Sequence, residues 1–288
     1  MSHQSVLLKE SVEALNLGDD KIFLDATFGA GGHTREALRL IKRLKIIALD
    51  QDPEVIDRAK EIGGIEAFNE NFRNLDKVLL EAKIEKVDAV LFDLGISSDQ
   101  LEESGRGFSF SRDEPLDMRM SKKGVIAKDI VNSWNEGALE LVLRGFGEET
   151  FSRRIAGEIV RRRKEKPLET TGDLVEAVLA VKPKNPRDKI HPATKTFQAI
   201  RIATNEELTS LEEGLVKGFE ALKSGGRFAV ISFHSLEDRI VKNFFRNLVG
   251  KGVALRVGKS LKPIRPSDEE VRSNPRSRSA KLRVIEKI

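Results

Sequence analysis

Apolar residues follow two different spacings along the first part of the chain, and their order predicts strands and helices in turn. Short apolar runs typical of buried strands occur at residues 21–26, 45–50, 65–68 and 87–93. Between and before them lie stretches with apolar residues at helical spacing, such as 6–17 and 34–44. This order predicts a mostly parallel sheet with helices on both of its faces.

The alternation stops after residue 93 and returns near the end of the chain. Residues 94–120 form a polar stretch whose length is typical of a functional loop, and only helical patterns follow as far as residue 222. Strand patterns return at 226–233, 253–258 and 281–288. We therefore predict an α/β, Rossmann-like sheet domain made of residues 1–110 and 223–288, with the last strand antiparallel. An all-helical domain, residues 111–222, interrupts it.

Cysteine content and charge narrow the possible functions. The chain has no cysteine, which excludes disulfides, zinc–thiolate sites and a cysteine nucleophile. Residues 1–110 carry 14 basic and 21 acidic side chains, whereas residues 226–288 carry 15 basic and 6 acidic ones. This asymmetry favours a neutral or cationic ligand in the first part and a polyanion in the last, although a solvated surface would give the same counts.

Neither a membrane span nor a signal peptide is predicted. No stretch approaches 18 uncharged apolar residues, and the N-terminal residues lack a basic segment followed by a long apolar one. We therefore expect a cytoplasmic protein without a membrane partner. The sequence leaves the oligomeric state open, and a homodimer is one option.

A glycine-rich loop follows the first predicted strand, in the stretch Asp25-Ala-Thr-Phe-Gly29-Ala-Gly31-Gly32-His33. Glycines let backbone N–H groups approach a ligand closely at the start of a helix. A phosphate-binding P-loop is excluded, because no Lys or Arg lies between Lys21 and Arg35. The dinucleotide pattern GxGxxG is matched only in part, because Thr34 stands in place of its third glycine.

Three predicted strands end in a carboxylate, and this favours a cofactor without phosphates. Asp25, Asp50 and Asp93 stand at such ends, where ligands of open α/β sheets bind. S-adenosylmethionine carries a sulfonium, an amino group and ribose hydroxyls, and Asp50 is placed to accept the hydroxyls. Phe72 follows the third strand and could stack on adenine, although taken alone it is better interpreted as a core side chain. A dinucleotide and a purely structural turn are the alternatives.

Five longer motifs carry a resemblance to a known family. They are DATFGAGGHTR, LFDLGISSDQLEESGRGFSFSRDEPLDMRM, HPATKTFQAIR, GGRFAVISFHSLEDRIVK and NPRSRSAKLR. Nearly the whole chain resembles the bacterial ribosomal RNA small subunit methyltransferase H family, also called MraW-type. The resemblance implies a class I methyltransferase sheet with a helical insertion. It also implies methyl transfer from S-adenosylmethionine to N4 of one cytidine of 16S ribosomal RNA near the decoding centre, leaving S-adenosylhomocysteine.

The resemblance also implies which residues bind the cofactor. Carried over position by position, they are Gly31, Gly32, His33, Asp50, Phe72, Asp93 and Gln100. Asp25 and Gly29 join this set from the loop pattern itself.

The candidate catalytic residues follow the fourth and fifth strands of the sheet domain. Many amino-methyltransferases carry a Pro-Pro-aromatic motif after the fourth strand, but here the chain reads Asp93-Leu-Gly-Ile-Ser-Ser98. Our hypothesis is that Asp93 or a nearby carbonyl accepts the hydrogens of the target amine, with Ser97 or Ser98 assisting. Asp93 serving only the cofactor is the alternative. His234 is a further candidate. Ser235, with Asp238 three residues later, matches the capping-box pattern of a helix start. The four histidines show no metal-ligand spacing, so we expect no metal.

The predicted RNA contacts are basic and aromatic residues of the long loop and the helical domain. A base must leave its stack before methylation, and cationic and aromatic side chains hold such a strand. The candidates are Arg106, Phe108, Arg112, Arg119, Arg161, Arg162, Lys189, Lys195 and Arg201. The expected partner is 16S ribosomal RNA within the small subunit or a late assembly intermediate.

Three other functions stay open at the level of sequence. One is a methyltransferase acting on a ribose hydroxyl or a protein. Another is a dinucleotide-dependent oxidoreductase, which Thr34 disfavours. The third is a ribosome-assembly factor that binds RNA without chemistry, which the glycine loop and Asp50 disfavour.

Overall fold

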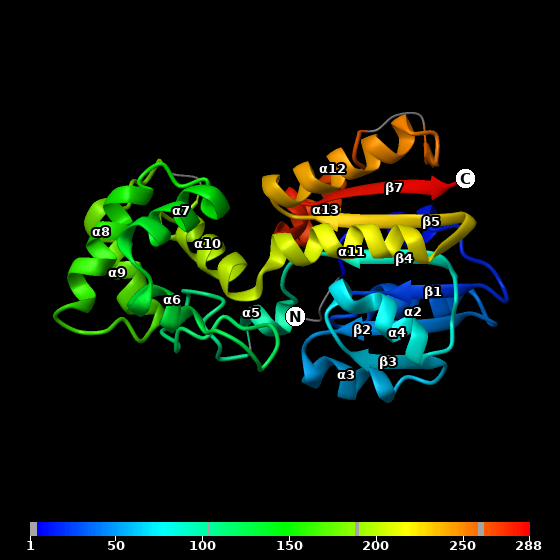
Figure 1. Ribbon diagram of the computed structural model, residues 1–288, viewed down its shortest axis with the longest axis horizontal. Coiled ribbons are helices and arrows are strands. Elements are labelled where there is room, and N and C mark those ends of the chain that lie inside the picture. Colours follow the sequence, from blue (N-terminus) through cyan, green and yellow to red (C-terminus); the bar gives the residue numbers. More distant parts are fainter. Residues whose placement is uncertain (1–4, 103, 188–189, 259–261) are drawn as a thin grey trace. The chain divides into compact units, whose positions relative to one another are not determined.

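The computed structural model describes residues 5–102, 104–187, 190–258 and 262–288. The chain divides into two compact units (Figure 1). Unit 1 consists of Met1–Gly95 and Leu208–Ile288, and unit 2 consists of Ile96–Glu207.

Unit 1 is built on one seven-stranded sheet with the order β3-β2-β1-β4-β5-β7-β6. The first five of these pair in parallel, and β7 runs antiparallel to β5 and β6. The strands are β1 Ile22–Asp25, β2 Lys45–Asp50, β3 Ile65–Asn69, β4 Val87–Asp93, β5 Leu222–Ser232, β6 Ala254–Arg256 and β7 Lys281–Lys287. The predicted α/β, Rossmann-like class with a mostly parallel sheet is confirmed, and so is the antiparallel last strand.

Helices cover both faces of this sheet because its central strands are apolar on both sides. Along β4, Val90 and Phe92 join one core with α4 (Leu75–Glu81), α11 (Glu207–Ala221) and α12 (Ser235–Gly250). The alternate residues Ala89 and Leu91 point to the other face, where α1 (Leu8–Ala14) and α2 (Gly32–Leu40) pack. The smaller elements of unit 1 are α3 Pro53–Lys60, η1 Phe72–Asn74, α13 Asp268–Ser273 and η2 Pro275–Ser279.

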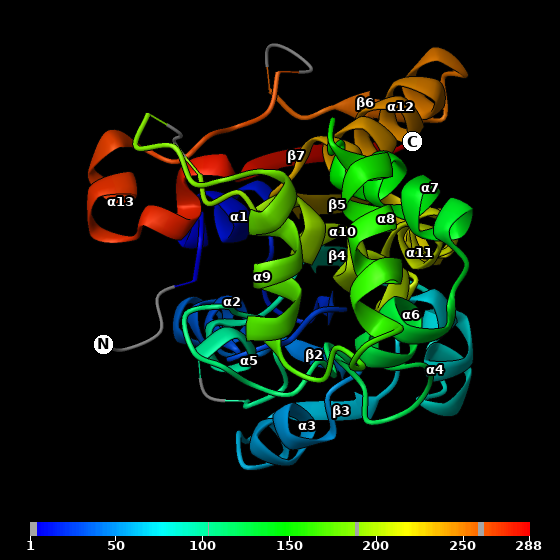
Figure 2. The same ribbon diagram turned by 90° about the vertical axis from the view of Figure 1, so that its left-hand side faces the viewer.

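Unit 2 is helical over the residues described. Its helices are α5 Ser98–Glu102, α6 Ala127–Ser133, α7 Glu136–Gly147, α8 Ser152–Arg163, α9 Thr171–Val181 and α10 Thr194–Asn205. Figures 1 and 2 show α7 beside both α8 and α10, and the apolar faces of these helices form one core. The capping box of Thr170 and Asp173 begins α9, because each side chain bonds the backbone N–H of the other.

The boundaries of the helical unit differ from the predicted 111 and 222. Unit 2 begins at Ile96, because buried side chains of the long loop, including Leu116 and Met118, pack into its core. It ends at Glu207, because Leu211 and Leu215 of α11 pack on the sheet of unit 1. A helical pattern alone cannot tell which of two cores a helix covers.

Candidate cofactor and catalytic site

The glycine loop of unit 1 needs glycine at two positions. Gly29 and Gly31 have φ angles of 53° and 73°, in the left-handed region that other residues adopt at a cost. A Cβ at Gly31 would also lie 2.4 Å from the ring of Phe28. The loop therefore turns sharply after β1 and starts α2 with Gly31 as its N-cap.

Asp50, at the end of β2, holds this loop in place. Its Oδ2 accepts the N–H of Gly29 at 2.9 Å, and its Oδ1 accepts the N–H of Asp52 at 2.9 Å. Burial raises the pKa of Asp50 to about 6, against the lowering effect of these two bonds. Each oxygen keeps a second lone pair, so the carboxylate can still accept ribose hydroxyls.

Asp25, at the end of β1, is buried and only half satisfied. The hydroxyl of Thr34 donates to its Oδ2 at 2.7 Å, whereas its buried Oδ1 has no hydrogen-bond partner among the described residues. Burial raises the pKa of Asp25 to about 6. A buried carboxylate oxygen without a protein partner can accept a hydrogen bond from a bound molecule.

Asp93, at the end of β4, shows the same pattern more strongly. Its N–H donates to the hydroxyl of Thr27 at 2.6 Å, but its buried Oδ1 lacks a partner within the described part of the chain. Burial raises the pKa of Asp93 well above its ordinary value, and the negative charges of Asp25 and Glu237 raise it further. Because β1 and β4 are parallel neighbours, these carboxylates meet at one edge of the sheet.

His33 connects the loop to Asp93. The buried imidazole lies with Nε2 3.2 Å from the carbonyl oxygen of Val6 and with Nδ1 3.8 Å from Oδ2 of Asp93. A carbonyl oxygen only accepts, so Nε2 carries the hydrogen. Nδ1 therefore faces the carboxyl group.

This edge of the sheet fits S-adenosylmethionine. The unpartnered oxygens of Asp25 and Asp93 offer acceptors to amino groups and stabilise positive charge. The loop contributes no basic side chain between Lys21 and Arg35, so it is poorly suited to polyphosphates. Asp25, Asp50 and Asp93 are the residues that would hold the cofactor's polar groups.

Part of the Phe72 ring packs against the protein interior. Its centroid lies 4.7 Å from that of Phe92, and a Cβ at Gly214 would lie 2.5 Å from its ring. The side chain is half-buried, so the core interpretation holds for part of the ring. Stacking on adenine stays a prediction.

Gln100 has a local role that the sequence analysis missed. The hydroxyl of Ser97 accepts the N–H of Gln100 at 3.1 Å, and Oε1 of Gln100 accepts the N–H of Ser97 at 3.1 Å. These reciprocal bonds are a capping box at the start of α5, and the S-x-x-Q pattern could have indicated it. Gln100 belongs to unit 2, and the side chain of Ser98 lies outside the described residues.

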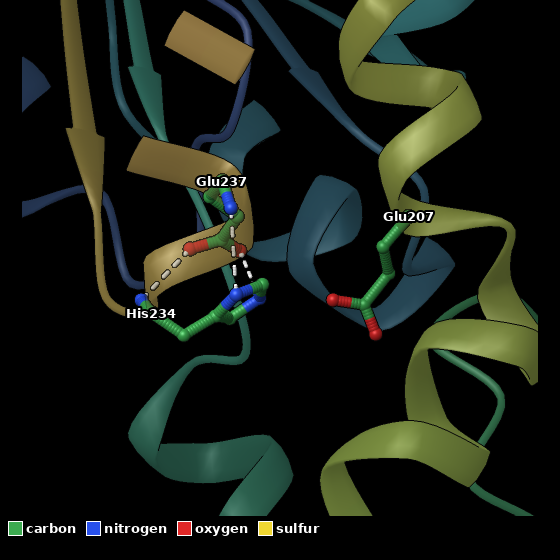
Figure 3. Close-up of side chains that lie close together, drawn as sticks. All are labelled: Glu207, His234 and Glu237. Carbon is green, nitrogen blue, oxygen red and sulfur yellow. Dashed lines mark hydrogen bonds and ion pairs between the residues drawn. The ribbon is translucent and has the colours of Figure 1, made fainter. Parts of the chain in front are cut away.

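His234 caps α12, a role the sequence analysis had expected of Ser235 (Figure 3). Its Nδ1 accepts the N–H of Glu237 at 3.4 Å, and Oε2 of Glu237 accepts the N–H of Phe233 at 2.9 Å. Asp238, the expected capping partner, instead pairs with Lys281 and Arg283. Sequence reasoning missed Glu237, because histidine is not a preferred cap.

The whole chain, residues 1–288, matches the family described as the MraW methylase family. The chain belongs to this family. The expected enzyme class, a methyltransferase, and the expected cofactor, S-adenosylmethionine, are thereby confirmed.

Two relatives with high sequence identity agree with this assignment. The chain is 45% identical to proteins named ribosomal RNA small subunit methyltransferase H from Caldicellulosiruptor saccharolyticus and Ehrlichia canis. These alignments cover 99% of this chain and 99% and 100% of the relatives. A solved structure of an rRNA methylase from Streptococcus thermophilus is 14% identical, with a TM-score of 0.45, over 100% of this chain and 99% of that one.

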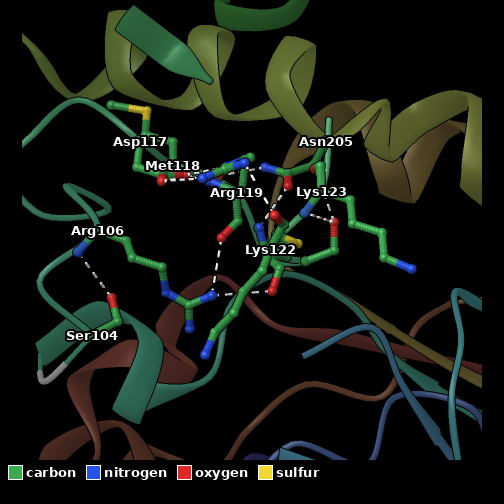
Figure 4. A network of polar contacts seen from close by, with 10 residues as sticks. Ser104, Arg106, Asp117, Met118, Arg119, Lys122, Lys123 and Asn205 are labelled. Atoms are coloured by element: carbon green, nitrogen blue, oxygen red, sulfur yellow. Dashed lines mark hydrogen bonds and ion pairs between the residues drawn. The ribbon is translucent and has the colours of Figure 1, made fainter. Parts of the chain in front are cut away.

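Within unit 2 of this family member, the residues predicted to bind RNA are mostly engaged with the protein itself. Phe108 is 7% exposed and packs in the helical core, and the stacking of its ring on RNA stays a prediction. Arg106 donates to the carbonyls of Arg119 and Met120, both at 3.1 Å (Figure 4). The guanidinium of Arg119 in turn donates two hydrogen bonds to the carboxylate of Asp117.

The predicted cations on the helices also have partners. Glu158 accepts hydrogen bonds from Arg161 and Arg162, which lower its pKa to about 2. Lys195 donates to the carbonyl of Glu148. Arg201 pairs with Glu207 through two hydrogen bonds.

Of the two remaining predicted RNA contacts, the structure describes one. Arg112 is exposed, whereas Lys189 lies outside the described residues. Arg153 and Lys164, which the prediction did not single out, are exposed at the two ends of α8. Their side chains form no hydrogen bond or ion pair with the described residues, so they are more available to a polyanion than Arg161 or Arg162.

None of the helices in the described part of the chain is both long and apolar enough to pass through a membrane.

Proposed function

We propose that this protein transfers a methyl group from S-adenosylmethionine to the exocyclic N4 of a cytidine in 16S ribosomal RNA, near the decoding centre. Relatives that are 45% identical over nearly the full length carry the name ribosomal RNA small subunit methyltransferase H, which supports the substrate. The family resemblance that the five motifs carry supports the assignment of the cytidine as target and its position near the decoding centre.

The observation that carries the proposal is the buried Oδ1 of Asp93, which has no hydrogen-bond partner among the residues that the structure describes. The lone pair of an exocyclic amine is conjugated with the ring, so the amine must be held and turned before it can attack. A hydrogen-bond acceptor does this by binding the amine hydrogens. Methylation at C5 of a pyrimidine commonly uses a cysteine thiolate, and this chain has no cysteine.

The residues of unit 1 have two tasks, to bind the cofactor and to act on the target amine. When bound, S-adenosylmethionine supplies an electrophilic methyl group on its sulfonium. Asp25, Gly29, Gly31, Gly32, His33, Asp50, Phe72 and Asp93 form its binding site. The cofactor role of Gln100 rests on the resemblance alone. Asp93 accepts the amine hydrogens and takes up the proton that the methylated amine releases, and its raised pKa favours that uptake. His234 is accounted for as a helix cap, so we assign it no catalytic step.

The substrate is the small ribosomal subunit or a late assembly intermediate in the cytoplasm, and unit 2 recognises its RNA. Extracting a stacked base costs roughly a few kcal/mol, which contacts with the phosphate backbone can offset. The exposed cations Arg153 and Lys164 on α8 are suited to those contacts.

The proposal is tested by incubating the protein with labelled S-adenosylmethionine and small subunits that lack the modification. Digestion of the RNA to nucleosides should then yield labelled N4-methylcytidine. Naked 16S RNA and fully methylated subunits are the two controls, and the second should take up no label. A 2′-O-methyl or C5-methyl product would contradict the assignment of the target atom. Labelled protein without labelled RNA would contradict the assignment of the substrate.

A further inference from the structure

The segment Ser5–Leu7, called here the strap, covers the glycine loop of unit 1. Ser5, Val6 and Leu7 are all buried, and Leu7 has a φ angle of 51°, which is strained for a residue with a side chain. Val6 and Leu7 belong to the apolar core that also contains Phe23 of β1. The strap is therefore a packed part of the domain, held in a conformation that its own sequence does not favour.

The strap meets the loop at two points. The carbonyl oxygen of Val6 accepts from Nε2 of His33 at 3.2 Å. Next to it, a Cβ at Gly32 would lie 1.9 Å from the hydroxyl oxygen of Ser5, so the strap occupies the space that a side chain would need. The position of the strap thus decides how the first turn of α2 is covered.

Besides its core packing, the strap bonds to a carboxylate from the other end of the chain. The N–H of Leu7 donates to Oε1 of Glu270 at 2.8 Å, across 263 positions of sequence. Leu7 is the N-cap of α1 and has no side-chain cap of its own. Glu270 is half-buried and lies on α13, which is six residues long and contains no buried residue.

The local sequence around Glu270 would favour a different partner. Ser267 caps α13, and Glu270 stands three residues later, in the S-x-x-E pattern of a capping box. In α9 and α12 the corresponding acid completes the box by accepting the N–H of the cap. In α13 the N–H of Glu270 bonds to Ser267, but its carboxylate bonds to Leu7 instead. The carboxylate of Glu270 therefore bonds to the strap and not to the N-cap of its own helix.

The contact with the strap favours one tautomer of the His33 ring. Because the Val6 carbonyl can only accept, the imidazole carries its hydrogen on Nε2 and directs Nδ1 to Asp93. The charged groups that act on Asp93 are Asp25 from β1 and Glu237 from α12. Without the Val6 carbonyl, the imidazole could take the other tautomer, with an Nδ1–H directed to the carboxyl group.

We propose that Glu270 is a positioning residue of the cofactor site: through Leu7 and Val6 it holds His33 as the Nε2–H tautomer, with Nδ1 directed to Asp93. This inference rests on the cofactor role of His33 and Asp93 in the proposed function. It assigns the C-terminal segment, which contributes no residue to the predicted site, a task at the glycine loop.

The test compares E270A, E270Q and E269A in the full-length protein. Glutamine keeps an Oε1 acceptor, so E270Q should retain the contact with Leu7, whereas E270A removes it. Glu269 is an exposed neighbour on the same helix and serves as the matched control. The ¹⁵N chemical shifts of the His33 ring report its tautomer directly, and calorimetry gives the affinity for S-adenosylmethionine.

We expect E270A to populate both tautomers and to lower the affinity about tenfold, as expected for a lost hydrogen bond to a charged group. E270Q should stay within about threefold of the original protein, and E269A should be unchanged. If E270A does not fold, E270D replaces it, because the shorter side chain withdraws the acceptor. An unchanged tautomer in E270A or E270D, or an E270Q variant no better than E270A, overturns the proposal.

The ring measurement needs neither RNA nor turnover. A wrong assignment of the methylated nucleoside would therefore leave this result intact, and a wrong assignment of Glu270 would leave the product analysis intact.

Discussion

The charged groups at the strand ends of unit 1 and those on the basic helices of unit 2 differ in whether they have partners. At the sheet edge, Asp25 and Asp93 each bury a carboxylate oxygen that has no partner among the described residues. On the helices, Arg161 and Arg162 share Glu158, and Arg201 pairs with Glu207. Both regions were predicted as sites from the kinds of residue they contain. Among the described residues, the first region leaves carboxylate oxygens without a partner, whereas the unpartnered buried atoms on α10 are the hydroxyls of Thr196 and Thr204.

The difference lies in what each arrangement costs. A buried acceptor without a partner costs roughly 1–3 kcal/mol, so it is kept where a ligand completes it. An exposed ion pair contributes roughly 0–1 kcal/mol, so Arg161 could exchange its acid for a phosphate at little cost. The paired arginines are therefore weaker evidence for RNA binding than the carboxylates are for a cofactor, although pairing does not exclude them.

The largest effect is expected for Asp93, one of the buried carboxylates of unit 1. Replacing Asp93 by Asn keeps the shape of the side chain but removes the group that takes up a proton. We expect kcat for methyl transfer to fall by at least about 100-fold. The matched control is Asp88→Asn at the opposite end of β4, where the side chain accepts the N–H of Ile22 and pairs with Lys223. Near-normal turnover of Asp93→Asn would reduce Asp93 to a cofactor ligand.

A smaller effect concerns the free energy of unfolding and its dependence on pH. Burial raises the pKa of Asp25 from 3.8 to about 6, so the folded state binds this proton more tightly than the unfolded state. The stabilisation is complete below pH 4 and is lost as the pH rises through about 6. The shift corresponds to a loss on the order of 2–3 kcal/mol. Asp50, whose pKa is also raised to about 6, acts in the same direction.

Denaturation of Asp25→Asn and of the original protein between pH 4 and pH 7 isolates this contribution. The stability of the variant relative to the original protein should increase across that range, because asparagine has no proton to lose. If the free energies of unfolding of the two proteins changed with pH in parallel, Asp25 would not have a raised pKa in the folded protein.

The smallest effect tests the basic side of the comparison, on the single helix α8. If exposed Arg153 contacts one phosphate, Arg153→Ala should lower the slope of log affinity against log salt by about 0.7–0.9. Arg162→Ala should change that slope less, because Arg162 already pairs with Glu158 and Glu176. Filter-binding titrations with 16S RNA at several salt concentrations measure both slopes. Equal changes in the two variants would mean that internal pairing does not predict which cations meet RNA.

The sequence predicted the sheet well, because strand and helix periodicity is a local property. The positions of the strands and the carboxylates at their ends follow from short patterns, whereas the antiparallel direction of the last strand depends on its neighbours in the sheet. The boundaries of unit 2 could not be predicted in the same way, since α11 has an equally good apolar face for either core. The cap of α12 was misplaced by one residue, because His234 is an uncommon cap and Ser235 a common one.

By itself, the amino-acid sequence determined the α/β class, the glycine loop and the acids that surround it, because these depend on neighbours along the chain. Only the tertiary structure decided which of those acids lack a partner, that Phe108 is buried, and that Glu270 bonds to Leu7 at the other end of the sequence. Whether a polar group is satisfied depends on what folding brings next to it. Residue type and spacing cannot supply that information when the partners are far apart in the chain.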